Sequence, residues 1–237
     1  MPEELEIEKD VLLEVPVEET EIKPPVKIDI AAWRPKTSLG LKVKNGEIKN
    51  IDEILENGLP ILEPEIVDVL LPEASEDFIF LGQAKGKFGG GARRIFKQTQ
   101  KKTPEGNKPS FACLAVVGDR KGHVGLGYGK SNDTLPARDK AIRKAKLNLI
   151  KIKLGCGSWE CKCSDPHSIP YKVEAKSGSV LIYLIPAPKG KGLVCDEELK
   201  KVLKLAGIKD IWIQSFGQTK RKLNFVSACF NALKKLK

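Results

Sequence analysis

Glycine alternates with large side chains in one short stretch, Val124-Gly-Leu-Gly-Tyr-Gly-Lys130, and this pattern constrains the fold more than any other feature of the sequence. A period of two is the side-chain period of a β-strand, so the three large residues share one face and the three glycines share the other. A strand face without side chains admits a close neighbour, either a packed helix or the backbone of a bound ligand. The sequence leaves both interpretations open.

The same stretch ends in Gly129-Lys130-Ser131, which raises the question of a nucleotide-binding phosphate loop. That loop needs a glycine five positions before the Gly-Lys-Ser triplet, because its backbone N–H groups wrap around the phosphates. Val124 occupies that position, so the register does not fit an NTPase. The dinucleotide-binding pattern also fails, since Lys130 stands where its third glycine belongs.

The surroundings of the glycine stretch predict a small α+β unit. An apolar, β-rich run covers residues 111–117, and residues 119–122 have turn chemistry. A helix is expected from about 135 to 151, with Thr134 as its N-cap, a stripe of small and apolar residues on one face and basic residues around the rest. A further strand is expected over residues 78–81, so that three strands and one helix complete the unit.

A second unit with a β-α-β-α order follows. We expect a strand over residues 179–185, a helix over 196–206 stopped by Gly207, a strand over 208–213 and a last helix capped by Asn224. The predicted organisation is therefore an acidic, partly disordered extension with short helices (1–74), an RNA-binding α+β domain (75–153), a cysteine-rich connector (154–170) and a C-terminal α/β domain (171–237). The short helices are expected near residues 51–58 and 64–71.

Charge is distributed unevenly along the 237 residues. Residues 1–75 contain 18 Asp and Glu against 8 Lys and Arg, whereas residues 76–237 contain 13 against 33. A net charge of +20 on the second part predicts a polyanionic partner, nucleic acid first. A membrane surface is disfavoured because the cations are spread over several elements, and no apolar run approaches the roughly 18 residues of a membrane span. The acidic N-terminus does not resemble a secretory signal.

Three cysteines and a histidine lie close together in the connector: Cys156, Cys161, Cys163 and His167. Four such ligands could close a tetrahedral zinc site, although the spacing lacks the usual C-x2-C knuckle. Free thiols, or a disulfide if the source is hyperthermophilic, are the alternatives. The sequence therefore predicts no required cofactor and leaves structural zinc open. Cys113, Cys195 and Cys229 are isolated and are expected to be ordinary core or surface thiols.

Catalysis is disfavoured by the residues available. The chain has only two histidines, His123 and His167, and a Cys–His nucleophile pair would have no third partner identifiable from the sequence. We therefore predict that the protein is not an enzyme.

These motifs, taken together, resemble the family of ribosomal protein number five of the small subunit. The run Ala115-Val-Val-Gly-Asp119, the glycine stretch and Ala141-Ile-Arg-Lys-Ala145 match its first domain. Pro186-Ala-Pro188 and Leu205-Ala-Gly-Ile208 are among the matches to its second. Gly155-Cys-Gly-Ser-Trp-Glu-Cys161 and Pro166-His167 resemble the archaeal branch. The similarity covers about residues 60–237.

The resemblance implies a first domain like the double-stranded-RNA-binding fold and a β-α-β-α second domain. It implies a structural, cytoplasmic role in the ribosome: binding small-subunit rRNA near the decoding region and the place where mRNA enters, and supporting translational accuracy. The implied partners are this rRNA, mRNA at its channel, and small-subunit proteins four and eight, with no membrane. An RNA-binding or assembly module outside the ribosome is the alternative.

One segment departs from the family pattern, because the usual Gly-Arg-Arg loop is displaced upstream to residues 91–94 and 101–109 stands in its place. We expect both segments to face RNA, within a cationic stretch 85–108 that docks into folded rRNA, since RNA duplexes are recognised mainly through shape and backbone. The predicted RNA-binding residues are Lys85, Lys87, Arg93, Arg94, Lys97, Lys101, Lys102, Arg120, Lys121, Lys130, Arg138, Arg143 and Lys144.

Overall fold

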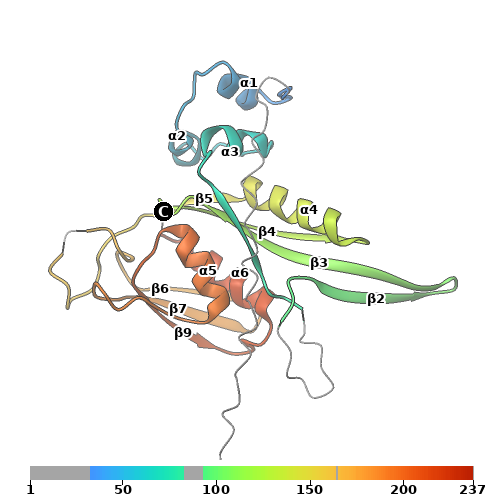
Figure 1. Ribbon diagram of the computed structural model, residues 1–237. Coiled ribbons are helices and arrows are strands. Elements are labelled where there is room, and N and C mark those ends of the chain that lie inside the picture. Colours follow the sequence, from blue (N-terminus) through green and yellow to red (C-terminus); the bar gives the residue numbers. More distant parts are fainter. Residues whose placement is uncertain (1–32, 83–92, 164, 237) are drawn as a thin grey trace, which may run out of the picture.

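The computed structural model describes residues 33–82, 93–163 and 165–236, and within them the chain forms two β-sheets and six α-helices (Figure 1). The predicted α+β class is confirmed. The acidic segment 1–30 and residues 83–92 of the glycine-rich basic stretch lie outside the described residues, so the expectations made for them remain predictions.

The first sheet is built around two long antiparallel strands. Its strand order is β1-β3-β4-β5, with β2 paired to β3 along the outer part of that strand. The β2–β3 hairpin runs beyond the rest of the sheet as a projecting arm (Figure 1). The elements of this unit are β1 (Ser75–Ile79), β2 (Lys97–Thr103), β3 (Gly106–Gly118), β4 (His123–Ser131), α4 (Thr134–Leu147) and β5 (Leu149–Lys151).

The bare face of β4 packs against α4, which decides between the two interpretations of the glycine stretch. A Cβ atom placed at Gly125, Gly127 or Gly129 would lie 2.2, 2.1 or 2.1 Å from a carbonyl oxygen of the helix. On the helix side of this contact the residues are also small: Ala137, Ala141 and Ala145, all fully buried. Two backbones approach this closely only where side chains are absent, so the glycines serve helix packing.

Four expectations for this unit were wrong. The sheet has five strands in place of the expected three, and its first strand covers 75–79 in place of 78–81. The helix ends at Leu147 instead of continuing to 151, because residues 149–151 pair with β4 as the short strand β5. Its N-cap is Asp133, one residue before Thr134. The polar stretch 97–108, which the sequence offered no apolar alternation to identify, forms β2 and the start of β3.

The second sheet has the order β6-β7-β9-β8 and carries two helices. Its pairings are antiparallel except for β8 with β9. The predicted α5 is confirmed, with Asp196 as N-cap and Gly207 at a φ of 86° as the left-handed stop. Asn224 is not a cap, since the last helix already begins at Lys222. The elements are β6 (Val173–Ser177), β7 (Val180–Pro186), β8 (Leu193–Val194), α5 (Glu197–Ala206), β9 (Ile211–Phe216) and α6 (Lys222–Leu233).

A single apolar core joins the two sheets. Leu114, Val116 and Val124 on the face of the first sheet opposite α4 belong to the same buried cluster as Leu199 and Leu203 of α5. A hydrogen bond also joins the two units, because the backbone N–H of Phe80, next to β1, donates to the carboxylate of Glu198 in α5 (2.9 Å). The two units are therefore held against each other by α5 and do not hang from a free linker.

Three short helices form what we call the helical cap, residues 33–71, above β5 and α4 (Figure 1). The cap has a small apolar core of its own, which includes Trp33, Ile54 and Ile66 and reaches Leu149 of the sheet. Helices near 51–58 and 64–71 were predicted and are present. The bounds are α1 (Ser38–Lys44), α2 (Ile51–Glu56) and α3 (Glu65–Leu70).

Candidate RNA-binding surface and metal centre

The hairpin arm carries three of the predicted RNA-binding residues, Lys97, Lys101 and Lys102, all exposed. In the β2–β3 register Lys101 lies directly opposite Lys108, and like charges at such a position destabilise a hairpin. Nearly every residue of β2 is solvent-exposed, so neighbouring apolar residues contribute little to holding it. The arm is therefore a solvated strand pair with positive charges on its surface.

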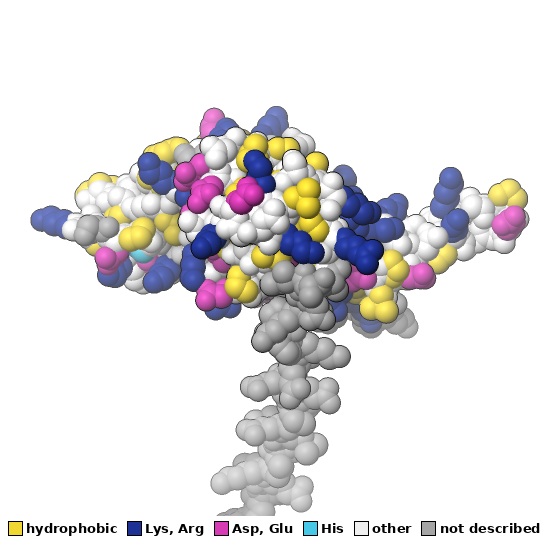
Figure 2. All heavy atoms as spheres, turned by 90° about the horizontal axis from the view of Figure 1, so that it is seen from above, with side chains coloured by type: hydrophobic (Ala, Val, Ile, Leu, Met, Phe, Trp, Pro, Cys, Tyr) yellow, Lys and Arg dark blue, Asp and Glu magenta, His cyan; other side chains and the backbone are white. Residues whose placement is uncertain are grey.

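The base of the arm brings Lys97 of β2 and Lys130 of β4 to either side of Ala112, because both residues are register partners of this one residue on β3. Directly opposite residues share a face of a sheet, so these two lysines point the same way. Figure 2 shows dark-blue Lys and Arg side chains gathered where the arm leaves the body. Arg93 and Arg94, just before β2, are exposed as well.

The outer side of α4 is a second basic surface. Arg138, Arg143 and Lys144 are exposed there, while the alanines opposite them are buried against the sheet. The Arg138 guanidinium lies over the Phe78 ring, 4.9 Å from its centroid. Such stacking fixes one face of the guanidinium and leaves its N–H groups available for phosphate.

The third basic surface lies at the opposite end of β3 from the arm tip, around the 119–122 turn. Arg120 has a φ of 61°, which non-glycine residues rarely adopt, and its backbone N–H donates to Leu205 O (2.9 Å). Its side chain lines an open groove of about 730 Å³ together with Lys200, Lys204 and Lys209 of the second unit. We call this the basic groove.

The structure therefore distributes the predicted residues over three surfaces and does not gather them in one. Lys121 differs from the others because it pairs with Glu73. Lys85 and Lys87 lie outside the described residues. The three groove lysines were missed by sequence reasoning, although Lys200 and Lys204 stand four residues apart in α5 and so share a helix face.

His123 connects the helical cap to the first sheet. Its Nδ1 contacts the Asp119 carboxylate and its Nε2 lies 2.8 Å from Asp52 Oδ1 of α2. Burial by itself disfavours the imidazolium, but the hydrogen bonds and charges of the two carboxylates outweigh it, so the pKa of His123 is raised. The same contacts outweigh desolvation at the carboxylates and lower the pKa values of Asp52 and Asp119. With both ring nitrogens engaged, His123 acts as a structural bridge.

Other acidic side chains of the cap also pair with the basic body. Lys146 of α4 lies 2.7 Å from Asp68, and Lys151 of β5 lies 2.7 Å from Glu56. Part of the negative charge of the N-terminal region is therefore used to dock the cap. The positive surfaces described above lie outside these contacts.

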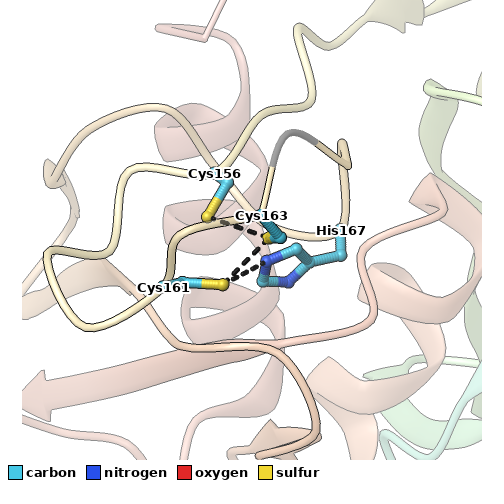
Figure 3. A group of neighbouring side chains, drawn as sticks. All are labelled: Cys156, Cys161, Cys163 and His167. Atoms are coloured by element: carbon cyan, nitrogen blue, oxygen red, sulfur yellow. Dashed lines mark hydrogen bonds between the residues drawn. The ribbon is translucent and has the colours of Figure 1, made fainter.

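The connector brings Cys156, Cys161, Cys163 and His167 together, with all four ligand atoms within 4.8 Å of one another (Figure 3). The Cys161 and Cys163 sulfurs are 2.9 Å apart, Cys163 and Cys156 are 3.5 Å apart, and His167 Nε2 is 3.7 Å from Cys161 Sγ. The hydrogen bond between the first two thiols lowers the pKa of Cys161 and raises that of Cys163. The predicted cluster thus exists as a spatial unit.

The other cysteines are ordinary buried or half-buried thiols, as predicted. Burial raises the pKa of Cys113 and Cys195 to about 11 and that of Cys229 to about 12, so these thiols stay protonated near neutral pH.

Across the described residues, none of the helices has the length and apolar character needed to cross a membrane.

Comparison with known proteins gives consistent matches along the chain. The family model described as "Ribosomal protein S5, N-terminal domain" matches residues 95–153, and "Ribosomal protein S5, C-terminal domain" matches residues 175–237. The curated relatives include three proteins from different organisms that carry the name "Small ribosomal subunit protein uS5". The Nanoarchaeum equitans protein is 57% identical over 88% of this chain and 90% of its own length. The Methanocaldococcus jannaschii protein is 48% identical over 89% of this chain and 90% of its own length. The Pyrobaculum calidifontis protein is 46% identical over 87% of this chain and 95% of its own length.

Proposed function

This chain belongs to the ribosomal protein S5 family, and from that premise we propose that it is a structural constituent of the small ribosomal subunit that binds rRNA. The family is structural and non-enzymatic, in agreement with the sequence prediction. The archaeal relatives agree with the archaeal-type features of the connector. The protein is accordingly located in the cytoplasm, within the ribosome.

The observation that carries the proposal is the hairpin arm with Lys101 opposite Lys108. A solvated strand pair that places like charges together gains stability when phosphates approach it, because each phosphate contact removes repulsion and releases counterions. The arm is a pair of strands, and its lysines suit RNA duplexes, which are recognised mainly through backbone and shape. We therefore assign the arm residues Lys97, Lys101 and Lys102 to rRNA contacts.

We assign Arg93, Arg94 and Lys130 to rRNA contacts at the base of the arm, and Arg138, Arg143 and Lys144 to rRNA contacts on the outer side of α4. Lys85 and Lys87 remain proposed with them. Arg120 belongs to the basic groove, where three lysines of the 171–237 unit face it. A groove lined by cations from both units is suited to a second RNA segment that crosses between them. Lys121 forms an exposed ion pair with Glu73. Because exposed ion pairs are weak, we expect Lys121 to exchange this partner for an RNA phosphate.

The resemblance supports a more specific location. We propose that the protein lies near the decoding region and the channel through which mRNA enters, that it contacts small-subunit proteins four and eight, and that it supports translational accuracy. The apolar core that the two units share through α5 suits this role, because a scaffold that fixes two RNA segments relative to each other needs a packed contact between its parts. The role requires no reacting cofactor, and a metal held by the connector would be structural.

The test is co-sedimentation with small subunits. The full chain should sediment in stoichiometric amounts with them, whereas an RNA-binding module that works outside the ribosome should stay in the free fraction. Lys204→Glu should weaken rRNA binding, because it reverses a charge in the basic groove, while the matched variant Lys176→Glu, at an exposed position of β6, should leave it nearly unchanged. Equal effects of the two variants would remove the groove from the proposed interface.

A further inference from the structure

The connector contains a set of ligands that no part of the RNA-binding role uses. Cys156, Cys161, Cys163 and His167 present three sulfurs and one imidazole nitrogen toward one point (Figure 3). Thiolate and imidazole are the ligands that select zinc among common divalent ions, while Mg²⁺ and Ca²⁺ prefer oxygen. Four protein ligands with no open position are typical of a structural site and not of a catalytic one.

The distances fit a small tetrahedral ion. A zinc–sulfur bond of about 2.3 Å in a regular tetrahedron places the sulfurs about 3.8 Å apart. The two short sulfur–sulfur separations are 2.9 and 3.5 Å, the Cys161 sulfur lies 3.7 Å from His167 Nε2, and all four ligand atoms lie within 4.8 Å of one another. Side-chain adjustments of about 1 Å would complete the coordination. Because the cysteines are free thiols at these distances, the arrangement is distinct from a disulfide.

Asp210 lies next to Nδ1 of His167, the ring nitrogen that does not face the cysteines. Its Oδ2 lies 2.9 Å from His167 Nδ1, a buried nitrogen that makes no hydrogen bond within the described part of the chain. Its Oδ1 accepts the backbone N–H groups of Gly190 (3.1 Å) and Gly192 (2.7 Å). A ligating histidine usually donates its second N–H to such a carboxylate, which fixes the tautomer and aims Nε2 at the metal.

The connector buries few apolar side chains. Trp159, in the middle of the ligand segment, is 90% exposed, while Ile169 is buried in the main core and Leu154 packs against that core partly buried. Backbone hydrogen bonds join its two ends, between Gly155 and Ser168 and from Gly157 N to Ile169 O, and the backbone N–H groups of Lys209 and Asp210 both donate to His167 O. A segment with so few buried apolar side chains gains order from a bound metal, because metal binding free energy becomes folding free energy.

We propose that Cys156, Cys161, Cys163 and His167 bind one structural Zn²⁺, with Asp210 as the positioning residue of His167. The metal joins the connector to the 190–192 turn through Asp210, and so fixes the link between the two units. This inference is independent of the proposed RNA binding, because the site uses none of the cations assigned to RNA.

The first experiment measures zinc in the untagged full chain, purified under reducing conditions. We expect one zinc per chain by elemental analysis, release of the metal when the thiols are modified, and visible tetrahedral bands with thiolate charge transfer when Co²⁺ replaces it. Zinc binding should also raise the melting temperature, since a ligand that binds only the folded chain stabilises it. A fully reduced chain that takes up neither Zn²⁺ nor Co²⁺ would overturn the proposal.

Variants locate the site. The double variant Cys161→Ser/Cys163→Ser should lose stoichiometric zinc, whereas Cys195→Ser, a half-buried cysteine outside the cluster, should retain it. Zinc retained by the double variant would place the metal elsewhere. If the double variant fails to fold, the cobalt spectrum of the unaltered chain still decides, because bands without thiolate charge transfer contradict cysteine ligation.

Asp210→Asn tests the positioning role. Loss of such a partner typically weakens metal affinity 10- to 100-fold, measured by competition with a chromogenic chelator. The matched control is Asp165→Asn, an exposed carboxylate paired with Lys189, which should leave zinc affinity unchanged. If Asp210→Asn lowers thermal stability but leaves zinc affinity intact, Asp210 only holds the 190–192 turn and its assigned role is wrong.

Discussion

The packing of β4 on α4 can be tested by adding one methyl group. In Gly127→Ala the new Cβ would lie 2.1 Å from Ala141 O and 2.2 Å from Ala145 N, whereas an ordinary contact begins near 3.4 Å. The helix would have to retreat by about 1.3 Å, the difference between these distances. Both contacted atoms belong to the backbone, so no side-chain rotation can relieve the overlap.

Two effects of opposite sign decide the outcome. Alanine in place of glycine within a strand should stabilise the fold by about 0.5–1 kcal/mol, because the unfolded chain has less freedom to lose. Overpacking a close-packed interface costs about 1–3 kcal/mol or more when backbone must move. We expect the second effect to win, with a net loss of about 2 kcal/mol, which is about 30-fold in the unfolding equilibrium.

The assay is urea unfolding of the full chain, followed by circular dichroism. Gly155→Ala is the control, because its Cβ would meet only Pro170 at 3.3 Å, and it should change the free energy of unfolding by no more than about 0.5 kcal/mol. The double variant Gly127→Ala/Ala141→Gly should not recover stability, since the clash is with backbone. A neutral or stabilising Gly127→Ala, or recovery in the double variant, would refute the reasoning.

Three further outcomes are expected. The pKa of His123 is raised in the folded state, so its stabilising effect is present below the unfolded pKa of about 6.5 and is lost as pH rises through the folded pKa. The variant His123→Gln should therefore show a smaller loss of unfolding free energy as pH rises through this range. A pH dependence identical to that of the unaltered chain would contradict the bridge to Asp52. Arg93→Ala and Arg94→Ala should each reduce the salt slope of rRNA binding by about one, measured by filter binding, and an unaltered slope would exclude them from phosphate contacts. Deletion of residues 1–30 should speed non-specific RNA binding if that acidic segment shields the basic body, and identical association rates would exclude shielding.

The sequence predicted those parts of the fold that are encoded by local periodicity. The alternation around Gly127 can only be a strand, and the apolar period of α5 with Asp196 before it and Gly207 after it can only be a helix of that length. The same local logic failed at 97–108, where an exposed hairpin has no buried face and therefore no alternation to detect. It also failed at 149–151, where pairing with β4 overrides the helical pattern.

The candidate sites divide in the same way. Composition alone predicted a polyanionic partner, because net charge needs no coordinates, and the spacing in the connector brought four metal ligands within one short segment. Only the tertiary structure placed Lys204 beside Arg120 and Asp210 behind His167, since these neighbours are far apart in sequence and meet through the packing of α5 and the fold of the second sheet. Local sequence determines which residues can form a strand, a helix or a ligand set, whereas contacts across the core determine which of them share a surface.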